Sequence, residues 1–442
     1  MRTLLEVREY DRISCGPDPG TGHAVLDRKD FRDLERFIRD LAGDGEHADA
    51  LEFLKVGYRR DVGDFVSVSS YVGLIQLQSG CQIQVLPKIC FGDDERDSGS
   101  EQTKRVFLRM LRSMRDFPGK AFRDADLKAD RMPLYEIFIS MYLREVSDLV
   151  RHGIRSAYAA REDDLRFFKG KLVVNEQVRR NAAHAERFRV RYDEYMVDRA
   201  ENRLVKSTLL KLRALTSSAG NARAIRQLLA AFESVSPSDN YQKDFTRVMI
   251  DRNMKDYDAL MRWSGVFLLN KGFTTFSGGN NARALLFPME KVFEAYVARQ
   301  LRKELADLDW EISVQDRGRY LFDEPCSQFA LRPDIVITPK EGRTIVLDTK
   351  WKSLVDNERI NYGISQADMY QMYAYSKKYD SPDVWLLYPV DKEMREHVRK
   401  HGEIAFRSHD GVHVRLFFVD VAHIGESLQD LKGLLMKAAQ HS

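Results

Sequence analysis

The chain of 442 residues is longer than one hydrophobic core usually supports, which predicts two or three domains. Its 43% hydrophobic and 31% charged residues exclude a disordered or membrane-embedded chain, while the net charge of +3 leaves room for a local basic groove. The four cysteines lack CxxC spacing, which argues against a zinc site or a disulfide scaffold. With no membrane-length apolar run and no secretory pattern, we expect a cytoplasmic protein without a membrane partner.

The N-terminal region, residues 1–130, is expected to contain β-structure. Within Phe65–Ile89, Gln82–Val85 alternates in polarity and Ser79–Gly80 is a turn signal, which together predict a hairpin. A polar run over Gly92–Arg105 predicts a loop, and the apolar spacing of VFLRMLRSMRDF after it predicts a helix. We therefore expect a β-containing N-terminal domain.

The middle region, residues 131–284, is expected to be mainly helical. LYEIFISMYLREVSDLV and NRLVKSTLLKLRALT carry apolar residues at intervals of three and four. GFTTFSGGNNARALLFP, with its paired glycines and asparagines, is typical of a linker into a C-terminal domain over residues 285–442. The arginine-rich residues 177–192 could follow DNA phosphates, but their interleaved acids favour an ordinary solvated helix face.

The C-terminal region is expected to form a mixed sheet. A helix at Met289–Leu305 is followed by strands, a second helix at Ser365–Tyr379 and further strands. This α-β-β-β-α-β order favours a mixed sheet flanked by helices. The fold class expected for the whole chain is α+β and multidomain, with a β-containing N-terminal region, a helical middle and a C-terminal α/β domain.

Charged side chains mark the ends of two apolar strands in that domain. In RTIVLDTKW the side chains alternate, so Asp348 and Lys350 share one face and Thr349 takes the other. Asp334 follows Pro333, which cannot donate to a sheet ladder and so tends to mark a strand edge. Convergent carboxylates raise each other's pKa unless a cation lies between them, and Mg²⁺ is held by one or two carboxylates plus water. With a lysine beside the ion, these are the parts for phosphodiester hydrolysis.

The strand-end residues resemble a known nuclease motif. PD at Pro333–Asp334, a spacer, and DTK at Asp348–Lys350 resemble the PD-(D/E)xK pattern, and Glu294 matches the acidic residue that many such nucleases place upstream. Gln371 and Tyr375, four apart on one helical face, match the QxxxY element of RecB-like members. The resemblance implies a restriction-endonuclease-like domain with the catalytic residues Asp334, Asp348, Lys350, Glu294, Gln371 and Tyr375. It implies that Mg²⁺, or alternatively Mn²⁺, is held by Asp334, Asp348, Glu294 and the Thr349 carbonyl.

Each of these features also has an ordinary structural interpretation. Asp334, Asp348 and Lys350 could form a salt bridge at strand ends. Glu294 could lie on the solvated face of an amphipathic helix, and the QxxxY pair could simply join its helix to the sheet.

A wider set of segments is similar to the McrC family, the nuclease subunit of the 5-methylcytosine (type IV) restriction system. These segments, spread over residues 65–380, are YVGLIQL with IQVLPKI, GKLVVNEQVRRN, YDEYMVDRAENRLVKSTL, FE, the PD and DTKW block, and ADMYQMYAYSKKY. The resemblance implies an endonuclease subunit that docks through its N-terminal region on a ring of McrB-type AAA+ GTPases, stimulates them and cuts double-stranded DNA with modified cytosine. No GxxxxGK[ST] frame occurs, so we expect no nucleotide site in this chain.

Two other functions stay open on the sequence alone. The chain could be a non-catalytic activator or scaffold of an AAA+ partner. It could also be a stand-alone RecB-like repair exonuclease, which metal-dependent digestion of DNA ends without a partner or nucleotide would favour.

Overall fold

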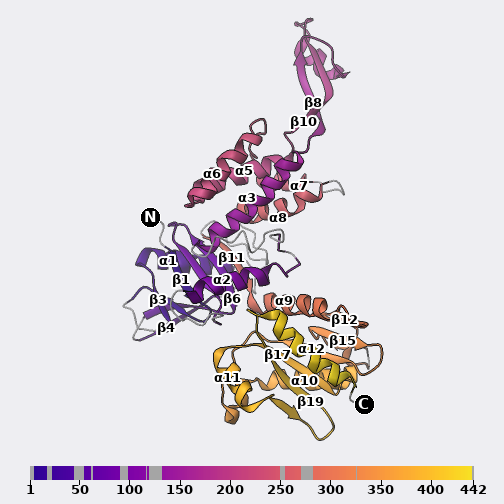
Figure 1. Ribbon diagram of the computed structural model, residues 1–442. Coiled ribbons are helices and arrows are strands. Elements are labelled where there is room, and N and C mark those ends of the chain that lie inside the picture. The colour runs from indigo at the N-terminus through magenta and orange to yellow at the C-terminus, as the bar shows by residue number, and fades with distance from the viewer. Residues whose placement is uncertain are drawn as a thin grey trace. The chain divides into compact units, whose positions relative to one another are not determined.

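The structure is a computed structural model, and it describes residues 4–16, 22–43, 54–60, 63–89, 98–115, 117–118, 132–248, 254–269, 282–324 and 326–440. The elements fall into two units (Figure 1). Unit 1 comprises Met1–Leu134 and Gly272–Ser442, and unit 2 comprises Tyr135–Lys271. The N-terminal and C-terminal parts of the chain therefore belong to the same unit.

Two sheets form the N-terminal part of unit 1. The elements are β1 Leu4–Arg8, β2 Arg12–Ser14, β3 His23–Val25, α1 Arg28–Gly43, β4 Leu54–Arg59, β5 Gly63–Val68, β6 Tyr71–Leu77, β7 Gln82–Leu86 and β11 Ala282–Pro288. The sheets have the strand orders β1-β7-β6-β11 and β3-β2-β5-β4. Strands β6 and β7 are antiparallel across a turn at Ser79 and Gly80, which confirms the predicted hairpin.

Helix α2 (Ser98–Leu111) begins earlier than the sequence predicts. The loop expected over Gly92–Arg105 is wrong from Ser98 onward, while residues 92–97 lie outside the described part of the chain. Glu101 lies in the first turn of the helix, where a negative charge is favourable. Polar residues at a helix start therefore produced the same pattern as a loop.

The segment expected to be a linker ends in a strand. Residues 282–288 form β11, which pairs antiparallel with β6, whereas residues 270–281 lie outside the described residues. Gly73 of β6 has a φ of +144°, and a Cβ there would lie 1.9 Å from the Leu285 carbonyl oxygen. Only glycine allows that close approach. The linker prediction is wrong for β11 because its apolar residues, such as the buried Phe287, follow strong glycine and asparagine signals.

The C-terminal part of unit 1 is built on a six-stranded sheet. Its strands are β12 Trp310–Val314, β15 Ile335–Pro339, β16 Ile345–Thr349, β17 Asp383–Pro389, β18 Ala405–Arg407 and β19 His413–Val419, with a separate hairpin of β13 Tyr320–Phe322 and β14 Gln328–Ala330. The sheet order is β12-β15-β16-β17-β19-β18. Strands β16, β17 and β19 run parallel, and the other neighbours are antiparallel, as expected for a mixed sheet.

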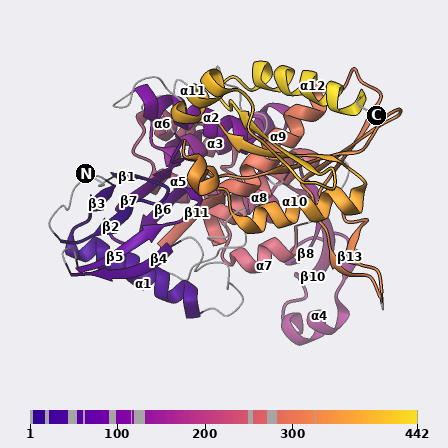
Figure 2. The ribbon, with the colours of Figure 1, turned by 90° about the horizontal axis from the view of Figure 1, so that it is seen from below.

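Helices cover both faces of this sheet. They are α9 Met289–Glu304, η3 Glu358–Gly363, α10 Gln366–Tyr379, α11 Lys392–His401 and α12 Ile424–Gln440. Figure 2 shows α10 on one side of the strands and α12 on the other. Met372 and Tyr375 of α10 share a hydrophobic core with Val336 of β15 and Val346 of β16. The face of the sheet that carries these two valines is therefore the face that α10 covers.

Unit 2 contains a group of helices, as the sequence predicts for these segments. They are α3 Leu134–His152, α5 Ala200–Leu215, α6 Ala219–Ala231, α7 Tyr241–Thr246 and α8 Lys255–Leu269. Trp263 and Phe267 of α8 stack with ring centroids 5.5 Å apart, and Phe138 of α3 packs against Trp263. Aromatic packing of this kind gives the helices their common core.

A β-structured arm interrupts these helices and was not expected from the sequence. We define the arm as Ala157–Met196, which contains β8 Ala157–Leu165, β9 Lys171–Leu172, α4 Val174–Asn181 and β10 Phe188–Met196. Its three strands have the order β8-β10-β9, and Figure 1 shows β8 and β10 extending away from the helices of unit 2. The prediction of a helix face for residues 177–192 is thus wrong for β10, because strand pairing with β8 sets its conformation.

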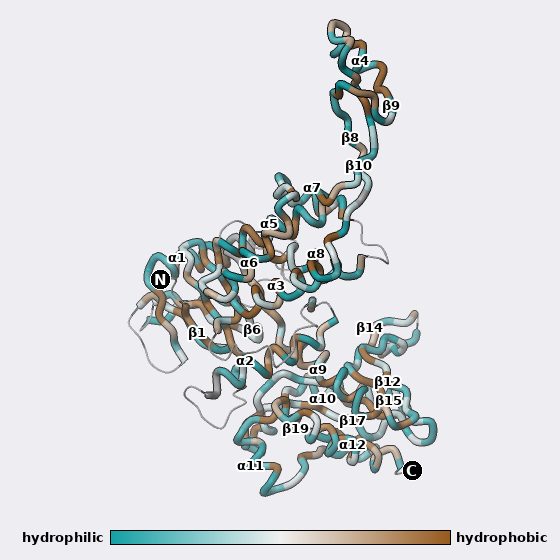
Figure 3. Tube along the Cα trace, turned by 45° about the horizontal axis from the view of Figure 1, so that its top comes forward, coloured by the Kyte–Doolittle hydropathy of each residue, from teal (hydrophilic) through white to brown (hydrophobic). Residues whose placement is uncertain are grey.

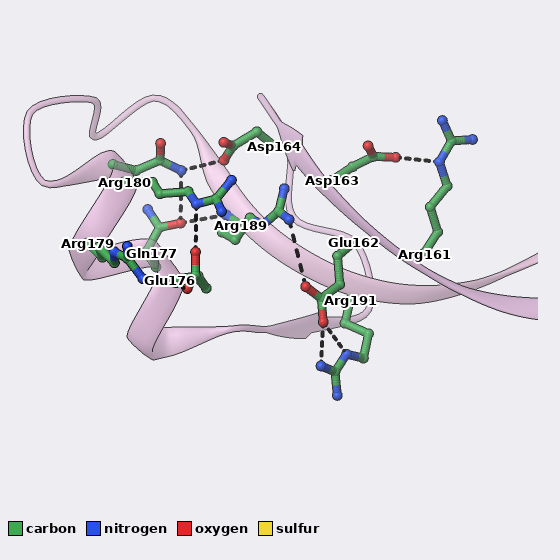
Figure 4. Close-up of polar contacts among 11 residues, drawn as sticks. Arg161, Glu162, Asp163, Asp164, Glu176, Gln177, Arg179, Arg180, Arg189 and Arg191 are labelled. Atoms are coloured by element: carbon green, nitrogen blue, oxygen red, sulfur yellow. Dashed lines mark hydrogen bonds and ion pairs between the residues drawn. The ribbon is translucent and has the colours of Figure 1, made fainter.

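Most arginines of the arm are paired with its own acids. Glu162 of β8 accepts from the Arg191 Nε at 2.7 Å and lies 3.7 Å from the Arg189 guanidinium (Figure 4). Arg161 pairs with Asp163 at 2.8 Å. Because these arginines pair with acids, the structure favours an ordinary solvated surface over a groove that binds DNA phosphates.

The arm also exposes large hydrophobic side chains. Six residues with at least 59% exposure lie on it: Tyr158, Phe167, Phe168, Val174, Val178 and Tyr195. Figure 3 shows hydrophobic residues gathered around β9 and α4. Several large apolar side chains left exposed on one short segment are typical of a protein contact.

Among the described residues, no helix combines the length and apolar character that crossing a bilayer requires.

Candidate active site

Two antiparallel strands bring Asp334 and Asp348 together. Strands β15 and β16 pair with Val336 opposite Val346, so two residues further along this register Asp334 is opposite Asp348. Because side chains alternate along a strand, both carboxylates belong to the sheet face of the two valines, which α10 covers. The antiparallel register thus joins residues that are separated in sequence.

Asp334 is fixed by the backbone and side chain of Thr349. Its Oδ2 accepts from the Thr349 amide at 2.7 Å and from the Thr349 hydroxyl at 2.6 Å. Burial raises the pKa of Asp334 above its usual range, although these two hydrogen bonds act to lower it. Asp334 therefore has a defined orientation at the end of β16.

Asp348 and Lys350 form a close ion pair on the shared face. The Lys350 Nζ lies 2.7 Å from the Asp348 Oδ2, and Asp348 is 2% exposed. Burial, followed by the nearby charge of Asp334, raises the pKa of Asp348 to about 7. Burial acts to lower the pKa of Lys350, but the surrounding carboxylates, Asp348 first, outweigh it and raise that pKa. The pair is much less exposed than an ordinary surface salt bridge.

Helix α10 supplies the next contacts to Lys350. The Lys350 Nζ donates to the Gln371 Oε1 at 3.1 Å, and the Gln371 Nε2 donates to the Tyr375 hydroxyl at 2.7 Å. The hydroxyl thus orients the amide so that its oxygen faces the ammonium. Gln371 and Tyr375 therefore do more than pack α10 against the sheet.

Glu294 of α9 joins the cluster through Gln315. Gln315 lies just after β12, its amide donates to the Asp334 carbonyl at 2.9 Å, and its Nε2 donates to the Glu294 Oε1 at 2.9 Å. Burial, followed by the charge of Asp334, raises the pKa of Glu294 to about 7. Glu294 therefore does not lie on a fully solvated helix face. The structure brings all six predicted catalytic residues to one end of the sheet.

A comparison with known families matches most of the chain. The family model described as the McrBC 5-methylcytosine restriction system component matches residues 66–389. The chain belongs to this family. The resemblance to McrC that the motifs carry is thereby confirmed.

Two solved structures of McrBC assemblies are similar to this chain. One is the refined half-complex from a tetradecameric assembly of Thermococcus gammatolerans McrB AAA+ hexamers with bound McrC, with a TM-score of 0.71 and 18% identity over 98% of this chain and 100% of that chain. Another is the Thermococcus gammatolerans McrBC complex, with a TM-score of 0.49 and 19% identity over 69% of this chain and 89% of that chain. No curated protein matches the sequence.

The oxygen donors of this McrBC component suit a hard divalent cation. Across the described part of the chain, no group of three or more His, Cys, Asp and Glu side chains is arranged to hold a metal ion. Mg²⁺ does not need such a cage, because it is commonly held by one or two carboxylates and keeps several waters. Asp334 and Asp348 are the two carboxylates that would hold such an ion, with the Thr349 carbonyl and Glu294 as the further oxygen donors. Burial, and after it the charge of Asp334, raises the pKa values of Asp348 and Glu294, and a bound cation would offset both effects.

Two residues of this site escaped the sequence analysis of the McrBC component. Asp368, in the first turn of α10, lies 3.7 Å from the Lys350 Nζ and 3.1 Å from the Lys352 Nζ. The spacing in the sequence could have identified Asp368, because Asp368 precedes Gln371 by three positions and so lies on the same face of the helix. Gln315 had no such signal, since its place depends on a backbone φ of +52° after β12.

Proposed function

We propose that this McrBC component is a Mg²⁺-dependent DNA endonuclease subunit of a modification-dependent restriction complex. It cuts double-stranded DNA that carries modified cytosine, and it acts in the cytoplasm with an McrB-type AAA+ GTPase. The observation that supports this most strongly is the buried pair of carboxylates, Asp334 and Asp348, with Lys350 on the same sheet face. Buried charges are costly, so their concentration at one sheet end indicates a functional site.

The reaction is hydrolysis of a phosphodiester. Water forms a new bond to phosphorus, one phosphorus–oxygen bond to a deoxyribose breaks, and negative charge increases on the phosphate oxygens. Mg²⁺ held by Asp334, Asp348 and the Thr349 carbonyl would supply Lewis acidity at that phosphate. Thr349 keeps the Asp334 carboxylate in place before DNA arrives, so little reorganisation is needed.

Lys350 supplies the positive charge of the site. Its ammonium has three donors, of which Asp348 and Gln371 engage two. Asp368 lies 3.7 Å from the ammonium, beyond hydrogen-bond distance, so the third donor can still reach the attacking water or a phosphate oxygen. Tyr375 keeps the Gln371 oxygen directed at the ammonium, and burial raises the pKa of Tyr375, so its hydroxyl stays protonated. Gln371 and Tyr375 therefore position the lysine.

The nuclease proposal is tested by reconstitution. The chain is incubated with its McrB-type partner, GTP, Mg²⁺ and a plasmid carrying 5-methylcytosine, and each component is omitted in turn. We expect cleavage only in the complete mixture. Digestion of DNA ends by the chain and Mg²⁺ alone would instead support the repair exonuclease. Stimulated GTP hydrolysis without any cleavage would support the non-catalytic activator.

Docking on the AAA+ ring is the second part of the proposal. The Thermococcus gammatolerans half-complex consists of McrB AAA+ hexamers with bound McrC, which supports a partner of this kind here. The resemblance assigns docking to the N-terminal region. The exposed hydrophobic residues of the arm favour a second contact, because an isolated ribbon that exposes aromatic side chains gains stability when a partner covers them.

The arm contact is tested with a pair of matched aromatic variants. Phe167→Ala removes an exposed ring from the arm, and Phe322→Ala removes a similarly exposed ring from unit 1. We expect Phe167→Ala to weaken stimulation of the partner's GTPase roughly tenfold, as for a moderate interface hot spot. Phe322→Ala should leave stimulation unchanged. Equal stimulation of the GTPase by both variants would contradict a contact between the arm and the partner.

A further inference from the structure

The indole of Trp351 connects the candidate active site to the N-terminal sheet. Trp351 directly follows Lys350, and it is buried. Its Nε1 donates to both carboxylate oxygens of Glu9, at 3.2 and 3.1 Å. Its ring packs against Phe293, with centroids 5.4 Å apart, and Phe293 directly precedes Glu294. Trp351 therefore directly follows one predicted site residue and touches the neighbour of another.

Glu9 is held rigidly by the N-terminal sheet. It follows β1, its own amide donates to the Leu86 carbonyl at 3.0 Å, and its carboxylate accepts from the Lys88 amide at 3.0 Å. Strand β1 pairs in parallel with β7, so both partners of Glu9 come from the end of the neighbouring strand. The carboxylate is thus a fixed acceptor aimed at the indole.

We propose that Glu9 is a positioning residue for the nuclease site and that it acts through Trp351. The inference rests on the proposed nuclease function. Glu9 fixes the indole, the indole fixes the chain just after β16, and this sets the direction of the Lys350 ammonium. Through Phe293 the same indole sets how α9, and with it Glu294, lies against the strand.

The local surroundings allow the strand end to move if this anchor is lost. A cavity of about 190 Å³, lined by residues that include Tyr10 and Lys352, adjoins the indole. The Lys350 amide is held by one backbone hydrogen bond, to the Leu387 carbonyl at 2.9 Å. Burial also raises the pKa of Glu9 to about 7, so the anchor is a costly group to keep inside the protein. Small displacements of a lysine in a nuclease site are expected to reduce turnover strongly.

Three variants separate positioning from simple packing. Trp351→Phe keeps a ring against Phe293 and removes the N–H donor. Glu9→Ala removes the acceptor, and Glu9→Gln restores an acceptor oxygen of the same shape. The matched control is Trp385→Phe in β17, because Trp385 is also buried and its indole nitrogen has no hydrogen-bond partner among the described residues.

Two readouts are taken on the full chain: plasmid cleavage with the partner, and hydrogen–deuterium exchange of residues 345–352 without it. We expect Trp351→Phe and Glu9→Ala to lower cleavage turnover and to speed this exchange, each roughly tenfold, while GTPase stimulation stays within about twofold. Glu9→Gln should recover most of the cleavage, and Trp385→Phe should change neither readout.

The outcomes distinguish this inference from the proposed function. Wild-type exchange and cleavage in Trp351→Phe and Glu9→Ala would overturn the positioning role, as would an equal effect of Trp385→Phe. If the wild-type chain shows no cleavage that depends on Asp348, the nuclease proposal fails, and the positioning role fails with it. The exchange measurement then still shows whether Glu9 holds the strand end.

Discussion

The candidate active site of unit 1 and the arm of unit 2 are both dense in charged residues, but they place those charges differently. In the arm, Glu162 and Arg191 pair on a solvated surface, with side-chain exposures of 33% and 58%. At the end of β16, Asp348 and Lys350 pair with exposures of 3% and 20%. Exposed pairs contribute little to stability, whereas buried ones cost desolvation.

This difference shows which charges carry information about function. The arm pairs can be exchanged for other polar residues at little cost, so their number says nothing about a site. The buried cluster is costly to maintain, and the raised pKa values of Asp348 and Glu294 record that cost. Burial, and not the density of charge, separates the two regions.

The largest expected effect comes from changing the shape of the buried cation. Lys350→Arg keeps the charge but replaces a compact ammonium by a planar fork that does not fit between the Asp348 and Gln371 oxygens. We expect plasmid cleavage to fall by roughly a thousandfold, comparable to loss of a transition-state donor. Lys352→Arg, on the more exposed partner of Asp368, is the control. Near-normal plasmid cleavage by Lys350→Arg would contradict a catalytic role for Lys350.

The next effect contrasts the pH dependence of a buried and an exposed carboxyl. Burial raises the pKa of Glu9 from 4.5 to about 7. The contribution of the protonated carboxyl to the free energy of unfolding is therefore fully present below about pH 4.5 and is lost as the pH rises through 7. Between pH 4.5 and pH 8, the free energy of unfolding of the wild type, measured with urea, should fall by an amount on the order of 2 kcal/mol. The Glu9→Gln variant should not show this fall.

The control for this measurement lies in the arm. Glu186 is exposed, and a hydrogen bond from its own backbone amide lowers its pKa. Any contribution of Glu186 to the free energy of unfolding is therefore lost as the pH falls. Glu186→Gln should therefore change the pH profile weakly and in the opposite sense. The same pH dependence of unfolding in wild type and Glu9→Gln would show that burial does not raise the pKa of Glu9.

A smaller effect is expected from distorting the arm without touching its charges. Gly170 has a φ of +74°, and a Cβ there would lie 2.4 Å from the Arg191 carbonyl oxygen. Gly153 has a φ of +93° but open space around it, so Gly153→Ala tests the strain alone. Gly170→Ala should weaken GTPase stimulation several-fold more than Gly153→Ala, as for loss of part of an interface. Equal stimulation by the two variants would contradict a docking role for the arm.

The sequence predicted which residues meet at the end of β16 because the signals there are local and periodic. Alternation along β16 put Asp348 and Lys350 on one face, and a spacing of four on α10 aligned Gln371 with Tyr375. The pairing of β15 with β16 was also accessible, because adjacent strands joined by a short turn usually pair. The mixed sheet with its flanking helices followed from the order of the elements.

The rest escaped prediction for specific physical reasons. Strand β8, AYAAREDDL, carries four charged residues in succession and lacks the hydrophobic alternation that marks a strand. Strand β10 does alternate from Phe188 to Asp193, with Val190 and Tyr192 buried, but its partner strand gave no matching signal. The contact of Glu9 with Trp351 joins residues 342 positions apart and depends on how two sheets meet within unit 1. No local signal in the sequence therefore marks Trp351.

If the buried carboxylates cut DNA while other surfaces engage the partner, a single substitution, Asp348→Ala, should separate the two activities. Cleavage of 5-methylcytosine plasmid and stimulated GTP hydrolysis are measured on the same preparation. We expect cleavage to fall by at least a hundredfold, as for loss of a catalytic group, and GTPase stimulation to stay at the wild-type rate. Cleavage by Asp348→Ala at the wild-type rate would contradict a catalytic role for the buried carboxylates.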